Sequence, residues 1–176
     1  IPAFAVGRTQ ELLYDLHQLT IEGRIPRVPV VIDSPLATEA TNVFRENTLD
    51  FDTTEPMVRA NARDLEALFA FDQLRFTPDV ADSKAIMHQH GPMIVIAASG
   101  MAESGRILHH LMYSAGDPRS TILIVGFQAE NTLGPRLVER RDEPESLDQS
   151  IRLLTAVTAS EPAFALAWAG PCTHAC

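Results

Sequence analysis

The segment that decides the fold spans residues 28–44 and has the sequence VPVVIDSPLATEATNVF. It begins with a short continuous apolar run, Val28–Ile32, which fits a strand covered on both faces. Ser34 is suited to cap a helix, and Pro35 is suited to its first position. Apolar residues then recur on one helix face, at Leu36, Ala40, Val43 and Phe44. The segment therefore predicts a buried strand that leads directly into a helix.

Short apolar runs and helical patterns alternate on both sides of that segment. Further strands are predicted at Pro2–Val6, Met93–Ala97 and Thr121–Val125. Further helices are predicted from about Thr9 to Glu22, through the apolar positions between Val58 and Phe69, and around Ile107–Met112. Strand–helix alternation of this kind favours a parallel sheet. We therefore expect an α/β fold, a three-layer parallel-sheet architecture of the Rossmann-like type.

The chain is expected to hold one folded domain, at residues 1–140. Residues 141–176 are predicted to be a linker and an unassigned, irregular tail, since the helical pattern weakens after Arg141 and Asp142–Ser146 is polar. Residues 47–85 are long for one crossover, so we interpret them as an excursion on top of the sheet.

The composition narrows the function classes. With 23 acidic and 14 basic residues, the net charge of −9 excludes a histone-like DNA binder, so any nucleic-acid binding must come from a local basic groove. No stretch approaches the roughly 20 apolar residues of a membrane helix, so no membrane partner is expected. The only two cysteines are Cys172 and Cys176, which argues against a disulfide framework and predicts a cytoplasmic location.

Each predicted strand ends in a polar or glycine-bearing turn. The four turns are residues 7–11, 33–35, 98–106 and 126–134. In open parallel sheets, ligands bind beyond the carboxyl ends of the strands. Glycines let the backbone approach a ligand, and Arg8 and Arg106 could make bidentate phosphate contacts. The four turns together favour a phosphate-lined groove, although each one alone is equally typical of an ordinary surface turn.

Signatures of other sites are missing. The chain has no Walker A loop and no G-x-G-x-x-G after a strand. His88 and His90 lack the further ligands of a dinuclear zinc site, and the adjacent His109 and His110 cannot easily chelate one ion from a helix. We therefore predict no metal site and no catalytic residue in this chain.

Four motifs nevertheless resemble a known family. They are FAVGRTQELL at residues 4–13, VVIDSPLA at 30–37, ASGMAESGRILHHL at 98–111 and GFQAENTLG at 126–134. In this order they resemble the β-CASP domain of metallo-β-lactamase-fold RNA-processing nucleases, in particular the bacterial and archaeal relatives of the cleavage and polyadenylation endonuclease. The resemblance covers about residues 1–136.

The resemblance implies an RNA-gripping domain within a zinc-dependent ribonuclease, whose metallo-β-lactamase part uses zinc-bound hydroxide to hydrolyse RNA phosphodiesters. The implied partners are single-stranded RNA and the metallo-β-lactamase domain of the same parent protein. The residues implied to bind RNA or its phosphates are Arg8, Thr9, Asp33, Ser34, Ser99, Gly100, Gly105, Arg106 and Gln128.

The sequence also departs from that family. The H-x-H-x-D-H zinc motif is absent, and Pro135 precedes Arg136 where the family has arginine. Near the end, residues 173–176 share only His-Ala with the family's histidine motif. We therefore expect a fragment, or a product whose reading frame changes near residue 140. Such a chain would bind no cofactor itself and would be inactive alone, with zinc held elsewhere in the parent enzyme.

Two alternatives stay open. A flavodoxin-like domain that binds a small phosphorylated ligand would use the same glycine turns, and the charge of −9 suits a small ligand better than RNA. A non-catalytic remnant would expose patches that the zinc domain normally covers, so it would self-associate, for example as a homodimer.

Overall fold

A three-stranded parallel sheet forms the centre of the computed structural model, which describes residues 1–47, 69 and 71–139. The strands are β1 (Val30–Ile32), β2 (Leu74–Phe76) and β3 (Ile94–Ile96), and their order in the sheet is β2-β1-β3. The central strand β1 is buried along its whole length, and Val30 pairs with the first residue of both neighbours. The predicted parallel sheet is therefore confirmed.

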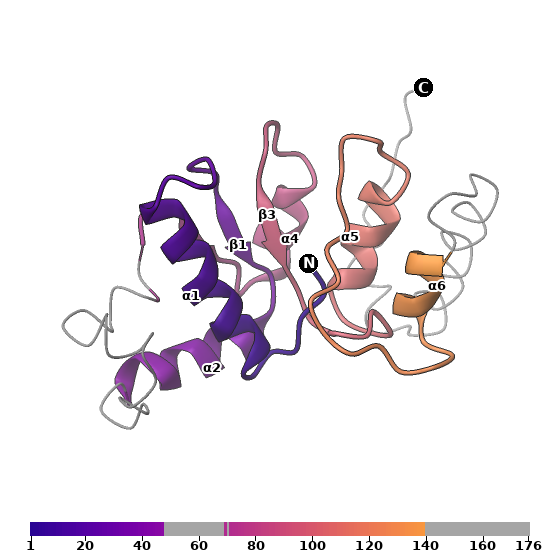
Figure 1. Cartoon of the computed structure of the whole chain (residues 1–176), viewed down its shortest axis with the longest axis horizontal. Helices are drawn as coiled ribbons and strands as arrows, with labels where there is room; N and C mark the ends of the chain where they lie inside the picture. The colour runs from indigo at the N-terminus through magenta and orange to yellow at the C-terminus, as the bar shows by residue number, and fades with distance from the viewer. Residues whose placement is uncertain (48–68, 70, 140–176) are drawn as a thin grey trace.

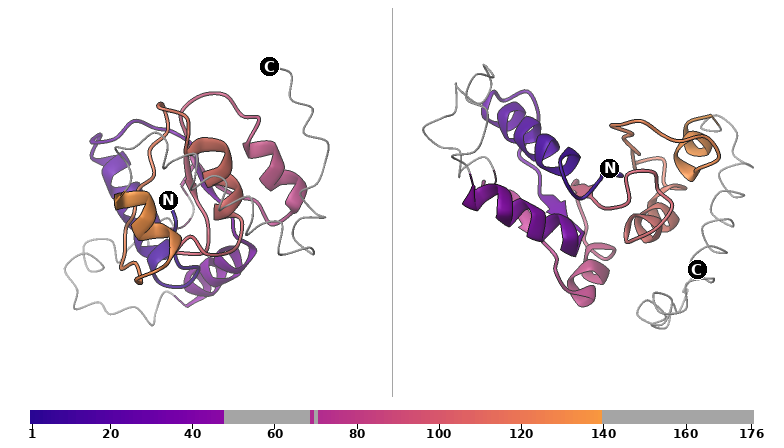
Figure 2. Two further views of the ribbon diagram at one scale, coloured as in Figure 1. Left: turned by 90° about the vertical axis from the view of Figure 1, so that its right-hand side faces the viewer. Right: turned by 90° about the horizontal axis from the view of Figure 1, so that it is seen from below.

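Five described helices surround the sheet. They are α1 (Arg8–Ile21), α2 (Pro35–Glu46), α4 (Val80–Ile86), α5 (Ile107–Ser114) and α6 (Leu133–Glu139). Figures 1 and 2 show the sheet between α1 and α2 on one side and α4 and α5 on the other, with α6 beyond α5. This arrangement confirms the predicted α/β fold with helices on both faces. No helix in the described part of the chain is long and apolar enough to cross a membrane.

Local hydrogen bonds explain where α1 and α2 begin. Ser34 caps α2 as predicted, because its Oγ accepts a hydrogen bond from the Ala37 N–H at 3.2 Å, and Pro35 is the first helical residue. At the start of α1, the Gln10 side chain accepts a hydrogen bond from the Gly7 N–H at 2.7 Å. The Gln10 amide also donates to Thr41 Oγ1 at 2.9 Å, which ties α1 to α2.

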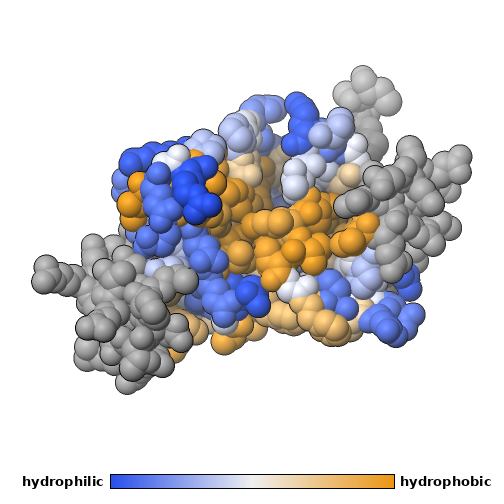
Figure 3. All heavy atoms as spheres, in the orientation of Figure 1, coloured by the Kyte–Doolittle hydropathy of each residue, from blue (hydrophilic) through white to orange (hydrophobic). Residues whose placement is uncertain are grey.

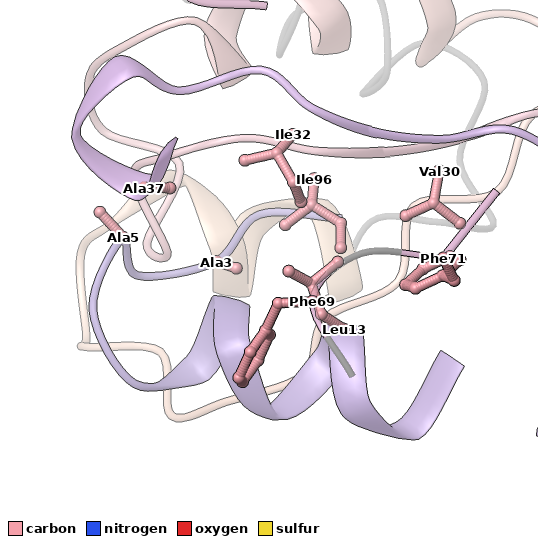
Figure 4. Packing of buried hydrophobic residues seen from close by; sticks show 9 residues of the cluster. All are labelled: Ala3, Ala5, Leu13, Val30, Ile32, Ala37, Phe69, Phe71 and Ile96. Atoms are coloured by element: carbon pink, nitrogen blue, oxygen red, sulfur yellow. The ribbon is translucent and has the colours of Figure 1, made fainter. Parts of the chain in front are cut away.

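The buried apolar residues form two clusters. The first lies between the sheet, α1 and α2 (Figure 4) and consists of Ala3, Ala5, Leu13, Val30, Ile32, Ala37, Phe69, Phe71 and Ile96. The second lies around α5 and α6 and consists of Ala97, Ala102, Ile107, Leu108, Leu111, Leu133 and Leu137. The two clusters meet at the end of β3, because Ile96 belongs to the first and Ala97 to the second.

Two of the predicted strands differ in the structure. The segment predicted as Pro2–Val6 makes only one parallel bridge, between Pro2 and Ala97. Residues 121–125 are not in a strand, and Leu123 is about half exposed. The first difference arises because the chain turns at residues 5–7 and enters α1 at Arg8. The second arises because the edge of β3 that residues 121–125 would use is already bonded to residues 1–3, through Ala3 N–H to Ala97 O and Ala97 N–H to Ile1 O, both at 3.1 Å.

Three elements were not predicted from the sequence. β2 has Arg75 at its centre, so it gives no continuous apolar run. α4 has only seven residues, too few to show a helical period, and α6 contains Gly134 and Pro135, which are weak helix formers. The helix expected between Val58 and Phe69, and the expected linker and tail at 141–176, lie outside the described residues apart from Phe69.

Candidate functional site

The turns that follow the three strands meet at one edge of the sheet. Asp33, directly after β1, donates its backbone N–H to Ile96 O of β3 at 2.8 Å. Thr77, directly after β2, donates its backbone N–H to Ile32 O of β1 at 3.2 Å. Because the strands are parallel, their carboxyl ends face the same direction, so these turns form the edge at which such sheets bind ligands.

Asp33 is the centre of a buried hydrogen-bond network at this edge. Its Oδ1 accepts hydrogen bonds from Arg106 Nη1 at 2.8 Å and from Thr77 Oγ1 at 2.7 Å. Its Oδ2 accepts one from Ser83 Oγ at 2.6 Å and lies 2.5 Å from His110 Nε2. The side chain of Asp33 is fully buried, and its four partners come from the end of β2, from α4 and from the start of α5.

The network determines the charge state of the carboxyl group. Burial alone raises the pKa of Asp33, but hydrogen bonds to His110, Ser83, Thr77 and Arg106 outweigh burial and lower the pKa to about 2. Asp33 is therefore ionised at neutral pH. Each of its two oxygens already contacts two partners, so this carboxylate is committed to internal bonds.

Arg106, predicted to contact phosphate, is directed into the protein in this structure. Besides Asp33, its guanidinium donates to the backbone oxygens of Thr77 at 2.6 Å and of Pro78 at 2.9 Å. Only 7% of the Arg106 side chain is exposed. Arg106 thus connects the start of α5 to the ends of β1 and β2.

The loop between β3 and α5 folds back on itself. Ser99 donates its backbone N–H to Ser104 O at 3.0 Å, and its Oγ accepts the Glu103 N–H at 3.2 Å. Gly105 closes this turn with φ of +80°, and a Cβ at this position would lie 2.5 Å from Ala98 O. Only glycine fits such a position without strain. The loop therefore presents Ser99 and Gly100 in one fixed backbone conformation.

Residues from three different turns lie together on the other side of this loop. The Phe4 carbonyl accepts hydrogen bonds from Thr9 N at 3.2 Å and from Thr9 Oγ1 at 2.7 Å. The Phe4 ring covers Gly100, where an added Cβ would lie 2.9 Å from ring atom Cδ2. Gln128 Nε2 donates to Gly100 O at 2.9 Å. The structure thus brings the predicted residues Thr9, Gly100 and Gln128 into one assembly.

Arg8 is the exposed cation beside this assembly. A Cβ on Gly126 would lie 4.0 Å from Arg8 Nε, so the arginine borders the turn that contains Gln128. Its side chain is 46% exposed and forms an ion pair with Glu11 at 2.6 Å. An exposed pair of this kind contributes little to stability. The guanidinium can therefore exchange Glu11 for an external anion.

Several residues of the site were missed by sequence reasoning. Thr77, Ser83 and His110 surround Asp33, but nothing in the apolar pattern marked the short elements that hold Thr77 and Ser83. One signal was available for His110: it follows Arg106 by four residues, which places both side chains on one face of a helix.

Among the described residues, no group of three or more His, Cys, Asp or Glu side chains could hold a metal ion. His88 and His90 are exposed. His109 is buried, and burial, followed by the neighbouring His110, lowers the pKa of His109 to about 4. His110 bonds to Asp33. The described residues thus offer no ligand set for zinc, which the resemblance assigns to the metallo-β-lactamase part of the parent.

Known relatives cover most of the chain. Ribonuclease TTHA0252 of Thermus thermophilus is 35% identical over 164 residues, which is 89% of this chain and 35% of the relative. Transcription termination factor FttA of Lokiarchaeum is 36% identical over 140 residues, 78% of this chain and 21% of the relative. RNase J-like protein of Methanocaldococcus jannaschii is 28% identical over 151 residues, 86% of this chain and 33% of the relative.

These matches bear on the extent and family of the chain. The chain spans between a fifth and about a third of the length of these relatives. The 89% share exceeds what residues 1–140 alone make up, so similarity to the Thermus protein continues past residue 140. The sequence model of the Beta-Casp domain matches residues 9–137, which include three complete motifs and half of the first. On that match, and as its motifs predicted, the chain belongs to the β-CASP domain family.

Proposed function

We propose that this chain is the RNA-gripping β-CASP portion of a zinc-dependent ribonuclease. In this proposal a metallo-β-lactamase-fold domain of the same parent protein holds the zinc and hydrolyses the RNA phosphodiester. Support comes from the family membership and from relatives named as a ribonuclease and an RNase J-like protein. Because this proposal assigns the zinc and the hydrolysis to the other domain, the chain alone is expected to bind RNA without cutting it.

The observation that carries the proposal is the position of Arg8 at the sheet edge, beside the assembly of Thr9, Gly100 and Gln128. The exposed guanidinium of Arg8 suits a phosphate group, because arginine can donate two parallel hydrogen bonds to two of its oxygens. The chain has a net charge of −9, so attraction to RNA must depend on such a local cation.

Burial divides eight of the nine candidate residues into two groups, and Gly105, which is partly exposed, belongs to the second through its backbone geometry. Arg8, Ser99 and Gln128 are exposed or partly exposed, and we assign them to contact with RNA. The other six hold the backbone of the edge in place: Thr9, Asp33, Ser34, Gly100, Gly105 and Arg106. In this proposal Arg106 acts on RNA only indirectly, through the geometry of the loop that precedes it.

A binding experiment on the purified chain tests this proposal. Fluorescence anisotropy of a short labelled single-stranded RNA should show affinity that falls as salt is raised. Arg8→Ala should weaken binding and reduce the slope against log salt by about 0.7. Glu11→Gln should strengthen binding, because it removes the carboxylate that competes for Arg8.

The matched control is Arg24→Ala, which removes another exposed arginine that also pairs with a glutamate, Glu22. Its RNA affinity should equal that of the unaltered chain. Equal losses of RNA affinity in the Arg8 and Arg24 variants would contradict the assignment of Arg8.

The same samples also test the alternative functions. Binding of free nucleotides in place of RNA would favour a small phosphorylated ligand. Self-association without RNA binding would favour a remnant, and light scattering of the same sample also tests for a homodimer. A cytoplasmic location stays a prediction.

A further inference from the structure

Two exposed phenylalanine rings lie on the assembly that contains Gly100. Phe127 is 77% exposed and Phe4 is 47% exposed. Figure 3 shows an apolar area in the middle of the face that Figure 1 presents, between the positions of α1 and α5. One exposed apolar side chain is ordinary on a protein surface. Two exposed phenylalanines at one glycine, Phe4 through its ring and Phe127 through the hydrogen bonds of Gln128, are a more specific feature.

Hydrogen bonds fix the backbone at both rings. Gln128 Nε2 donates to Phe127 O at 3.1 Å and to Gly100 O at 2.9 Å, so Phe127 is linked to the loop after β3. Phe4 contacts the same loop, because a Cβ on Gly100 would lie 3.0 Å from Phe4 N as well as 2.9 Å from its ring. The backbone at both phenylalanines, and the Phe4 ring through its contact with Gly100, are therefore positioned before any ligand binds.

A cation lies beside the rings. Arg8 Nε is 4.0 Å from where a Cβ of Gly126 would stand, and Gly126 directly precedes Phe127. The Phe4 carbonyl accepts two hydrogen bonds from Thr9, the residue that follows Arg8. The half-exposed Arg8 is thus linked to each phenylalanine through one intervening residue, Thr9 for Phe4 and Gly126 for Phe127.

Exposed aromatic rings beside a guanidinium have a known use in binding single-stranded nucleic acid. Each nucleobase has an apolar π-face that stacks on an aromatic ring, and the flanking phosphate needs a cation. Arginine and aromatic residues are also enriched in protein–protein interfaces, so the residue types alone do not choose between the two partners. RNA is favoured because the chain belongs to the β-CASP family and its relatives are named as a ribonuclease and an RNase J-like protein.

We propose that Phe4 and Phe127 form a base-stacking platform, which holds unpaired nucleobases of single-stranded RNA while Arg8 contacts an adjacent phosphate. The platform extends the proposed function and depends on it. It specifies why the RNA-gripping surface would bind a strand that carries bases more tightly than one with the same backbone and no bases. Stacking accepts every base, so the platform is expected to select single strands over duplexes without selecting a sequence.

Two RNA probes of equal length separate stacking from charge. One is a short oligoadenylate, and the other carries the same phosphates and riboses but no bases. In the full chain, Phe127→Leu keeps an apolar side chain but removes the π-face. It should weaken oligoadenylate binding roughly fivefold or more and leave the abasic probe unchanged. Arg8→Ala should weaken binding of both probes.

Tyr113→Leu is the matched control, since it removes another half-exposed aromatic ring, on α5. It should leave both affinities unchanged. A 2-aminopurine base within the oligoadenylate should lose fluorescence on binding, and Phe127→Leu should restore it. These readouts respond to stacking and not to a general loss of folded protein.

The outcomes distinguish this proposal from the one on which it depends. If the unaltered chain binds neither probe, both proposals are overturned. If RNA binding depends on Arg8 but Phe127→Leu binds oligoadenylate normally, the platform is overturned and the proposed function stands. If Phe127→Leu abolishes self-association without changing RNA affinity, the rings belong to a protein interface, and the platform is again overturned.

Discussion

Replacing Arg106 with methionine should destabilise the chain by about 3 kcal/mol. The change keeps an unbranched apolar side chain but removes the charge that faces Asp33 at 2.8 Å. Removal of one partner from a buried ion pair costs roughly 3–5 kcal/mol, because the other charge stays buried without compensation. We expect the lower end of that range, since Thr77, Ser83 and His110 still contact the carboxylate.

An ion pair at the surface provides the control for this prediction. Arg119 Nη2 and Asp117 Oδ2 also lie 2.8 Å apart, but the Arg119 side chain is exposed to solvent. Arg119→Met should therefore change stability little, because water and salt screen the pair. The two variants differ in burial and not in the distance between the charges.

Urea unfolding at neutral pH, followed by circular dichroism, measures both variants. The midpoint should fall for Arg106→Met with an unchanged slope, and its melting temperature should fall by roughly 6–12 °C. Asp33→Asn should lower the free energy of unfolding less in the Arg106→Met background than in the unaltered chain, because the two residues interact directly. A loss below about 1 kcal/mol for Arg106→Met would refute the argument that the pair is shielded from solvent.

Two further predictions concern the same edge. Gly105→Ala should cost about 2 kcal/mol or more in urea unfolding, because its φ is +80° and the new Cβ would meet Ala98 O; an unchanged midpoint would contradict the loop geometry. The pKa of His109 is lowered from 6.5 to about 4, so its contribution to stability is complete above pH 6.5 and is lost as pH falls toward 4. Unfolding at a series of pH values should show a loss of about 3 kcal/mol over this range, which His109→Asn should remove.

Local signals made part of the fold predictable. Ser34 and Pro35 mark the start of α2 through their own backbone preferences, and Val30–Ile32 is apolar because β1 is covered on both faces. β2 has no such mark, because Arg75 interrupts it. The absence of a strand at residues 121–125 has no local signal. It depends on residues 1–3, which are far away in the sequence and bond to the edge of β3.

The candidate site was predictable as a place but not in its internal arrangement. The rule for parallel strands brings the turns to one edge, whatever their side chains do. Arg8 and Arg106 both begin a helix after a glycine-bearing turn, so the sequence gives no reason to treat them differently. The difference arises from Asp33, which lies 73 residues before Arg106. Its carboxylate accepts a hydrogen bond from Arg106, whose side chain is buried as a result.

The division of the core into two clusters gives the Asp33–Arg106 pair a role in cooperativity. Asp33 follows β1 of the first cluster, and Arg106 directly precedes Ile107 of the second. Sub-global unfolding of the α5–α6 half would have to separate a buried ion pair, so this half and the sheet are expected to open as one unit. A binding edge that cannot open locally is preorganised. The conformational entropy of its residues is lost when the chain folds, so ligand binding does not have to order them again.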